Sequence, residues 1–126
     1  MSRWTEADRL LRLIVRQRGD CERCGGPGSQ VAHILRRGYH ATRCDERNVW
    51  WLCGGPGSND CHGLVDNDWA EFNALVMKTI GEAEFSRLRD KAHVGPPQSL
   101  SVFWPAETTR LRARCAELGI PLRGAA

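Results

Sequence analysis

The sequence of 126 residues has the length of one domain and carries a formal net charge of +3, with 41% hydrophobic and 26% charged residues. It contains no run of about 20 apolar residues, which argues against a membrane-spanning helix, and its first residues lack the apolar segment of a signal peptide. We therefore expect a cytoplasmic protein whose cysteines bind metal rather than pair as disulfides.

Arginine supplies almost all of the positive charge. It is concentrated in residues 1–47, which are net basic, whereas the remainder of the chain is slightly acidic. Guanidinium groups bind phosphate in a bidentate manner and are weakly hydrated. An anionic partner such as nucleic acid is one interpretation of this distribution, and an arginine-rich solvated surface is the other.

The first predicted element is a helix over residues 5–18. Its apolar residues recur at helical spacing, with arginines between them. Thr5 is the predicted N-cap, Asp8 stands three residues later in a position typical of a capping box, and Gly19 is expected to end the helix.

Two short strands are predicted next. The segment that contains them is rich in glycine, cysteine and arginine, and its apolar runs are residues 31–35 and 49–52. The polar residues 36–48 between the runs are expected to form a loop. Because side chains alternate between the two faces of a strand, we expect one of Trp50 and Trp51 to pack in the core.

Helical spacing of apolar residues returns in the second half of the chain. Residues 69–80 are predicted to form one helix, Gly81 breaks the pattern, and a further helix covers residues 85–92 before a Gly-Pro-Pro stop. Residues 105–118 are predicted to form the last helix, with Pro105 in its first turn.

Four of the six cysteines have the spacing of zinc ligands: Cys21, Cys24, Cys53 and Cys61. Zinc favours four tetrahedral thiolate or imidazole ligands, and a CxxC turn supplies two of them. Seven residues separate the second pair, and we expect this glycine-rich spacer to loop out and return the last cysteine. A redox CxxC is one alternative, and unligated core cysteines are another. Cys44 is interpreted as an uncommitted thiol and Cys115 as a core residue of the last helix.

Two of the four histidines are placed within this cysteine pattern. His33 lies in the first apolar run, His62 directly follows the last cysteine of the cluster, and Asn48 stands between them in the sequence. A buried core histidine is the alternative interpretation of His33. For His62, the alternative is that it replaces one cysteine as a zinc ligand.

This combination resembles the HNH endonuclease family of the ββα-metal superfamily. The matching motifs are, in chain order, Cys21-Glu-Arg-Cys24, Val31-Ala-His33-Ile34, Asn48-Val49, Leu52-Cys53 and Cys61-His62. They cover about residues 21–66. The resemblance implies a small zinc-stabilised ββα-metal core, and the helices that flank it are predicted from periodicity alone. Together they predict an α+β fold of one domain, with an N-terminal helix over 1–20, a zinc-bound HNH core over 21–68 and C-terminal helices over 69–126.

The resemblance also implies a function, which is metal-dependent hydrolysis of DNA phosphodiester bonds by nicking or cleavage. His33 would be the general base that activates a water molecule, and Asn48 would hold the loop or the base in orientation. His62 would bind a catalytic divalent cation, Mg²⁺ or another, that offsets charge on the phosphate. The zinc bound by the four cysteines would be structural.

One position departs from the family pattern. Many members carry a metal-binding Asp or His directly before the base, where this chain has Ala32. An aspartate must then complete the metal site, and the candidates are Asp66, four residues after His62, and Asp45 on the loop. If neither aspartate reaches the metal, the chain is a non-catalytic zinc-containing DNA-binding module. A zinc-dependent protein-interaction module is a further alternative.

The basic loop beside the expected base is predicted to contact the DNA backbone through Arg36, Arg37, His40, Arg43 and Arg47. The alternative is a loop whose charges are only solvated. The likeness to small free-standing family members further suggests a phage or mobile-element context. The partners expected in that context, besides DNA, are a second copy of the chain or a phage packaging or recombination protein.

Overall fold

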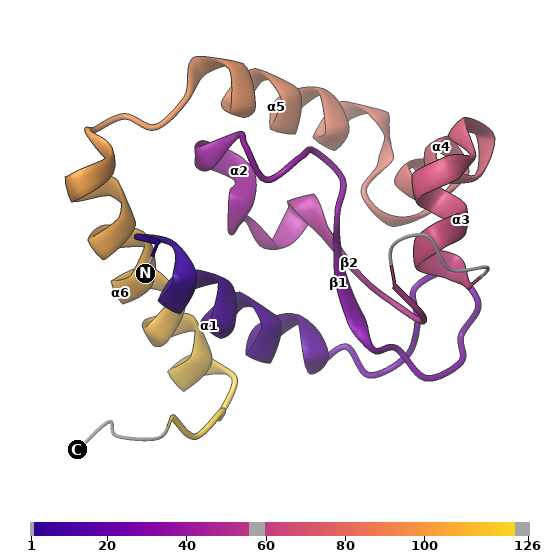
Figure 1. The fold of residues 1–126 in the computed structure, drawn as a ribbon, viewed down its shortest axis with the longest axis horizontal. Coiled ribbons are helices and arrows are strands. Elements are labelled where there is room, and N and C mark those ends of the chain that lie inside the picture. Colours follow the sequence, from indigo (N-terminus) through magenta and orange to yellow (C-terminus); the bar gives the residue numbers. More distant parts are fainter. Residues whose placement is uncertain (1, 56–59, 123–126) are drawn as a thin grey trace.

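A computed structural model describes residues 2–55 and 60–122 of the chain (Figure 1). The elements are, in order, α1 (Thr5–Arg16), β1 (Gln30–His33), α2 (His40–Arg43), the 3-10 helix η1 (Glu46–Asn48), β2 (Val49–Leu52), α3 (Cys61–Asn67), α4 (Trp69–Thr79), α5 (Gly81–Val94) and α6 (Leu100–Glu117). The expected α+β class is therefore confirmed. Within the described ranges, no helix combines the length and the apolar character needed to cross a membrane.

The sheet consists of β1 and β2, which pair antiparallel with His33 opposite Val49 and Ala32 opposite Trp50. Both strands lie within a residue or two of the predicted runs. All four residues of β2 are buried, because helices cover both faces of the sheet. The expectation that only one tryptophan packs in the core is wrong: Trp50 and Trp51 are 1% and 2% exposed and pack on opposite faces.

The first face of the sheet is covered by α1 and α6, which also pack against each other (Figure 1). The apolar positions of α1 recur at helical spacing and point into this core, where Leu10 and Leu11 are almost fully buried. Trp104 and Leu111 of α6 and Trp51 of β2 complete the same cluster. We call this cluster the first core.

The second core lies on the other face, where α3 packs on α4. Ala32 of β1 and Trp50 of β2 contribute to it together with Cys61 and Val65 of α3. Helix α5 packs on α4 and on the short helix α2, and it runs across the end of the sheet away from α1 (Figure 1). The sheet therefore separates two apolar clusters, and each cluster is closed by a different pair of helices.

The start of α1 differs from the prediction. Thr5 is the first helical residue rather than the N-cap, and Trp4 occupies the cap position without a side-chain hydrogen bond. The carboxylate of Asp8 does not close a capping box, because it binds the guanidinium of Arg43 from α2. The helix ends at Arg16 and the chain turns at Gly19, whose φ of +80° is the left-handed conformation that favours glycine.

Two further expectations about local structure are wrong. Residues 36–48 are not a simple loop, because α2 and η1 form there, and the Asp45 side chain accepts the backbone N–H of Arg47 at the start of η1. Helix α6 begins at Leu100, five residues before Pro105, which lies inside it. Proline has no N–H, so the helix lacks one backbone hydrogen bond at this position. The burial of Phe103 and Trp104 in the first core offsets the free-energy cost of that missing bond. The looped spacer expected between the second pair of cysteines falls largely on residues 56–59, which lie outside the described residues.

Candidate metal centre and histidine site

The four cysteines predicted as zinc ligands come together in space. Their Sγ atoms all lie within 4.8 Å of one another, and those of Cys24 and Cys53 are 3.9 Å apart. Tetrahedral zinc with bonds of about 2.3 Å places its sulfur ligands at about 3.8 Å from one another. The cluster therefore has the size and the donor set to bind a metal ion such as zinc.

Regular elements hold each pair of cysteines in place. Cys21 and Cys24 lie in a turn that is anchored to the sheet, where the N–H of Glu22 donates to the carbonyl of Trp51 at 2.9 Å. Cys53 directly follows β2, and Cys61 is the first residue of α3. The cluster thus joins the turn after α1, the end of the sheet and the start of α3.

Electrostatics around the cluster favour thiolate at one position in particular. Burial acts to raise the pKa of Cys21, but backbone N–H groups of Cys24, Cys53 and Arg23 outweigh it and lower that pKa to about 6. Backbone N–H groups that point at sulfur stabilise the anionic form, which is the form that binds metal. The peptide groups of this turn are therefore arranged for a metal ligand.

Arg23 is a residue of this centre that sequence reasoning did not select. Its guanidinium donates to the Sγ of Cys61 at 3.5 Å and to the carboxylate of Glu71 in α4 at 2.8 Å. A cation beside the cluster offsets the negative charge of four thiolates. The signal available in the sequence was its place inside the CxxC pair.

The remaining two cysteines lie outside the cluster. Cys44 and Cys115 are fully buried in the first core, which confirms the core assignment of Cys115. The Sγ of Cys44 lies 3.6 Å from the carboxylate of Asp8, and burial raises the pKa of this thiol far above its usual range. Cys44 is therefore a neutral thiol that is committed to packing.

His33 is the last residue of β1, and its ring is oriented by the neighbouring backbone. Nε2 lies 2.9 Å from the carbonyl oxygen of Arg43. A carbonyl only accepts hydrogen bonds, so we assign the ring proton to Nε2 and the lone pair to Nδ1. In agreement with this assignment, Arg37 donates from Nε toward Nδ1 at 3.4 Å.

The surroundings of His33 favour its neutral form. Burial lowers the pKa of the imidazole below its ordinary value of 6.5, and the nearby guanidinium of Arg37 adds to this effect. The hydrogen bond to the Arg43 carbonyl acts in the opposite direction and is smaller. His33 also lines a hollow of about 350 Å³ between β1 and α1. Near pH 7 it is thus a neutral base at the edge of a cavity.

Asn48 pins the segment that carries the Arg43 carbonyl. Its side chain is fully buried. The amide donates to the carbonyls of Leu35 and Thr42 at 3.1 and 3.0 Å, and its oxygen accepts the N–H of Leu35 at 2.8 Å. Both ends of the segment are therefore tied to one amide group, which fixes the path of the chain beside His33.

His62 and Asp66 lie one turn apart on α3, with 3.6 Å between Nε2 and Oδ2. His62 is 7% exposed, and its Nδ1 is buried without a hydrogen-bond partner among the described residues. Ala32 packs in the second core beside Cys61. Within the described ranges, the four cysteines form the one group of three or more metal-binding side chains, so His62 and Asp66 have no third protein ligand there.

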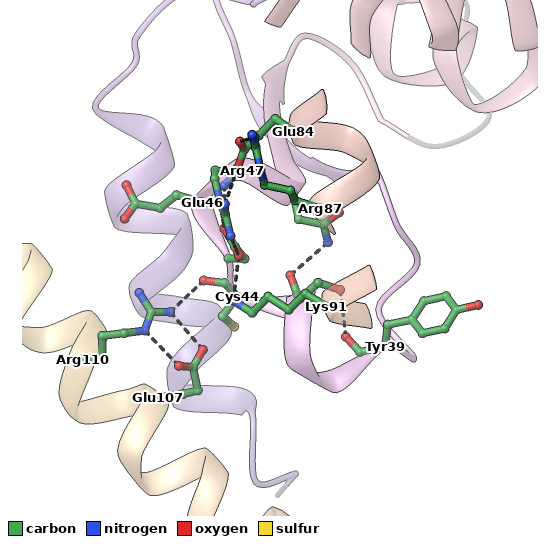
Figure 2. A network of polar contacts seen from close by, with 12 residues as sticks. Tyr39, Cys44, Glu46, Arg47, Glu84, Arg87, Lys91, Glu107 and Arg110 are labelled. Carbon is green, nitrogen blue, oxygen red and sulfur yellow. Dashed lines mark hydrogen bonds and ion pairs between the residues drawn. The ribbon is translucent and has the colours of Figure 1, made fainter. Parts of the chain in front are cut away.

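Asp45, the other candidate ligand, belongs to a polar network that joins η1 to α5. Its carboxylate accepts hydrogen bonds from Arg47 at 2.8 Å and from Lys91 at 2.8 Å. Arg47 also pairs with Glu84 of α5, and Figure 2 shows Arg47 between Glu84 and Lys91. The oxygens of Asp45 are therefore already occupied, and of the two aspartates Asp66 lies closer to His62.

The five basic residues predicted to contact DNA have different environments. Arg43 is 11% exposed on its side chain and is held by Asp8, and Arg47 is paired as described above. His40 packs between the rings of Trp4 and Trp104. Arg36 lies over the ring of Tyr39 and is exposed, as is Arg37. Arg36 and Arg37 are thus the exposed members of the group that have no carboxylate partner among the described residues, and Nε of Arg37 donates to Nδ1 of His33.

Comparison of the chain with protein-family models, with curated proteins and with solved structures gave no significant match in any of the three searches.

Proposed function

We propose that this protein is a metal-dependent endonuclease of the HNH type that hydrolyses DNA phosphodiester bonds with His33 as general base. The observation that carries the proposal is the state of His33. Its Nε2–H is bound to a backbone carbonyl, its Nδ1 accepts a long hydrogen bond of 3.4 Å from Nε of Arg37, and the residue lines a hollow with arginines in its wall. A neutral, oriented imidazole next to a cationic cavity is the arrangement that general-base attack on a phosphodiester requires.

Two further features support the HNH interpretation. The chain order of β1, β2 and α3, with Cys61 and His62 opening α3, is the order expected for a ββα-metal core. Asn48 fixes the segment that orients the base, which suits the role that the resemblance implies for it. The four cysteines would bind a structural zinc that holds β2 and α3 together.

In this proposal His33 takes a proton from water at Nδ1 while the water oxygen bonds to phosphorus. The bond from phosphorus to one ester oxygen breaks, and the departing oxygen takes a proton from solvent. The carbonyl of Arg43 holds the imidazole in position throughout. His62 and Asp66 would be the residues that hold a divalent cation, which when bound could offset phosphate charge. Because α3 packs on the face of the sheet opposite the hollow beside His33, the proposal assigns that cation no part in the step at Nδ1.

A non-catalytic zinc-containing DNA-binding module is the second candidate. Two observations favour it, namely Ala32 in place of a ligand and the absence, within the described residues, of a third protein ligand beside His62 and Asp66. Mg²⁺ retains several waters and is often bound by only one or two carboxylates together with substrate phosphate. Two protein ligands are therefore few for a catalytic site, but they do not exclude one.

The test is a plasmid assay with the zinc-loaded protein. Supercoiled DNA is incubated with wild type, His33→Ala and His93→Ala, each with Mg²⁺, Mn²⁺, Ni²⁺ or EDTA. His93 is an exposed histidine of α5 and serves as the matched control. We expect metal-dependent nicking that falls at least about 100-fold in His33→Ala and is unchanged in His93→Ala. Because the pKa of His33 is lowered, the acid limb of the rate should have its midpoint below pH 6.5.

Intact plasmid under every metal, with the protein folded and zinc-bound, would favour the binding module instead. Equal nicking by wild type and His33→Ala would remove His33 from the reaction.

A further inference from the structure

The wall of the hollow beside His33 is built largely by α1, which sequence reasoning left outside the functional site. Arg9 and Arg12 of α1 line this hollow together with Arg37, and the only carboxylate in the wall is that of Asp8. Both oxygens of Asp8 are bonded to the guanidinium of Arg43. Three arginines therefore face the cavity, and the one acidic group there is already neutralised.

The arginines of α1 form a row on its exposed side. Arg9, Arg12 and Arg16 stand at positions i, i+3 and i+7, which share one face of a helix. Arg9 pairs only with the exposed carboxylate of Glu6, an interaction that contributes little in water. Arg16 has no hydrogen-bond or ion-pair partner among the described residues, and it is exposed.

Arg12 has a more defined setting in the middle of this row. It donates to the carbonyl of Ser29 at 3.3 Å, and its guanidinium lies 5.3 Å from the ring centre of Trp51. These contacts fix the direction of the side chain and leave several of its N–H groups free. The row thus contains one oriented guanidinium between two that can adapt to a ligand.

The row has the dimensions of a nucleic-acid backbone contact. Seven residues of helix extend about 10 Å, and one DNA strand rises by about 3.4 Å per nucleotide, so the row spans about three nucleotides. In contrast, Arg43 and Arg47 of the segment after β1 are occupied by carboxylates of the protein itself. On α1 and beside His33, the arginines that have no carboxylate partner among the described residues are therefore Arg12, Arg16 and Arg37, and Nε of Arg37 donates to Nδ1 of His33.

We propose that the exposed face of α1, formed by Arg9, Arg12 and Arg16, together with Arg37, binds the phosphate backbone of duplex DNA and places one phosphate in the hollow at His33. This inference deepens the proposed function, because it names the surface that holds the substrate. It assigns the backbone contacts to the helix before the zinc cluster rather than to Arg43 and Arg47.

The test is duplex binding without added divalent metal, so that binding is measured apart from cleavage. Anisotropy of a labelled 20-base-pair duplex is recorded over a series of NaCl concentrations for wild type, R9Q/R16Q and R87Q/R89Q. The α5 pair is a matched control: Arg87 pairs with Glu84 three residues away, as Arg9 does with Glu6. Arg89, like Arg16, has no carboxylate partner among the described residues and lies over the ring of Phe85. Thermal melting checks that every variant is folded.

We expect R9Q/R16Q to weaken binding about tenfold or more near 0.1 M salt and to reduce the slope of log K against log salt by about two. R87Q/R89Q should change neither quantity by a comparable amount. Equal losses of duplex affinity in the two double variants, or no loss in either, would overturn the proposal that the exposed face of α1 binds DNA. The two proposals are tested separately, because the anisotropy assay measures binding and the plasmid assay measures cleavage. If His33→Ala nicks plasmid as wild type does, the general-base role falls, whereas the α1 face depends only on the duplex binding of R9Q/R16Q.

Discussion

Asp45 shows how a residue that resembles a metal ligand in sequence acquires a structural role in the fold. The side chain is 9% exposed and accepts hydrogen bonds from Arg47 and Lys91. Burial alone would raise its pKa, but these two cations outweigh burial and hold the pKa well below its usual range. The carboxylate therefore stabilises the folded state by tying η1 to α5.

The replacement Asp45→Asn should lower the free energy of unfolding by about 1–3 kcal/mol at pH 7. It leaves two cations without their partner, and both are about half exposed, which limits the loss. A carboxylate with a depressed pKa stabilises the fold above its unfolded pKa near 3.8, and this contribution is lost as pH falls through the folded pKa. The difference between variant and wild type should therefore shrink below pH 4 in urea unfolding. A difference that stays constant from pH 7 to pH 3 would contradict this role.

The spacing of the cysteines in the sequence was sufficient to predict that they lie together, but the spacing of the charged residues did not predict their partners. A CxxC turn brings two ligands together by local geometry, and the second pair stands at the end of one strand and at the start of the following helix. The partners of Arg43 and Asp45 are Asp8 and Lys91, which come from α1 and α5. Such pairs depend on how helices pack, so no short stretch of sequence encodes them.

At the scale of elements, the periodic segments were predicted well. Both strands and the helices α1 and α4 lie close to the expected ranges, because a short apolar run or helical spacing is visible within one segment. Helix α5 begins at Gly81, four residues before its expected start. The short helix α2 and the early start of α6 were missed. Four residues give no period, and Pro105 is a stronger local signal than the burial of Phe103 and Trp104 that extends α6.

The turn between α1 and β1 provides an element-scale prediction. Gly28 packs directly on the indole of Trp51, and a methyl group at this position would overlap that ring. The ring cannot move aside easily, because it is 2% exposed and its Nε1–H donates to the carbonyl of Gly19 at 3.1 Å. We expect Gly28→Ala to destabilise the protein by about 2 kcal/mol through overpacking, measured by urea unfolding.

Gly38 provides the control for this substitution, because an added methyl group there would meet nothing within 4 Å. Gly38→Ala should stay within about 0.5 kcal/mol of wild type. Equal effects of the two alanines would mean that the contact between Gly28 and Trp51 does not constrain the turn.

At the scale of the whole molecule, the sheet divides the interior into two cores that depend on different supports. The first core is closed by the long helices α1 and α6. The second is closed by α3 and α4, and two of the clustered cysteines, Cys21 and Cys61, belong to it. Helix α3 has seven residues, so a metal ion bound by the cysteine cluster at its first residue would link this helix firmly to the end of the sheet.

Metal removal should therefore affect the two cores unequally. We expect one zinc ion per chain, and chelation should abolish amide protection in α3 and α4 before α1 and α6, because structural zinc contributes about 10 kcal/mol or more to local folding.

Cys24→Ser should lose the metal with little damage to packing, since Cys24 is exposed, whereas Cys115→Ala should keep it. Hydrogen exchange and metal analysis test both statements. Full protection of α3 after the zinc has been removed would mean that the second core is held by apolar packing alone, and zinc retained by Cys24→Ser would mean that the fourth ligand is a different residue.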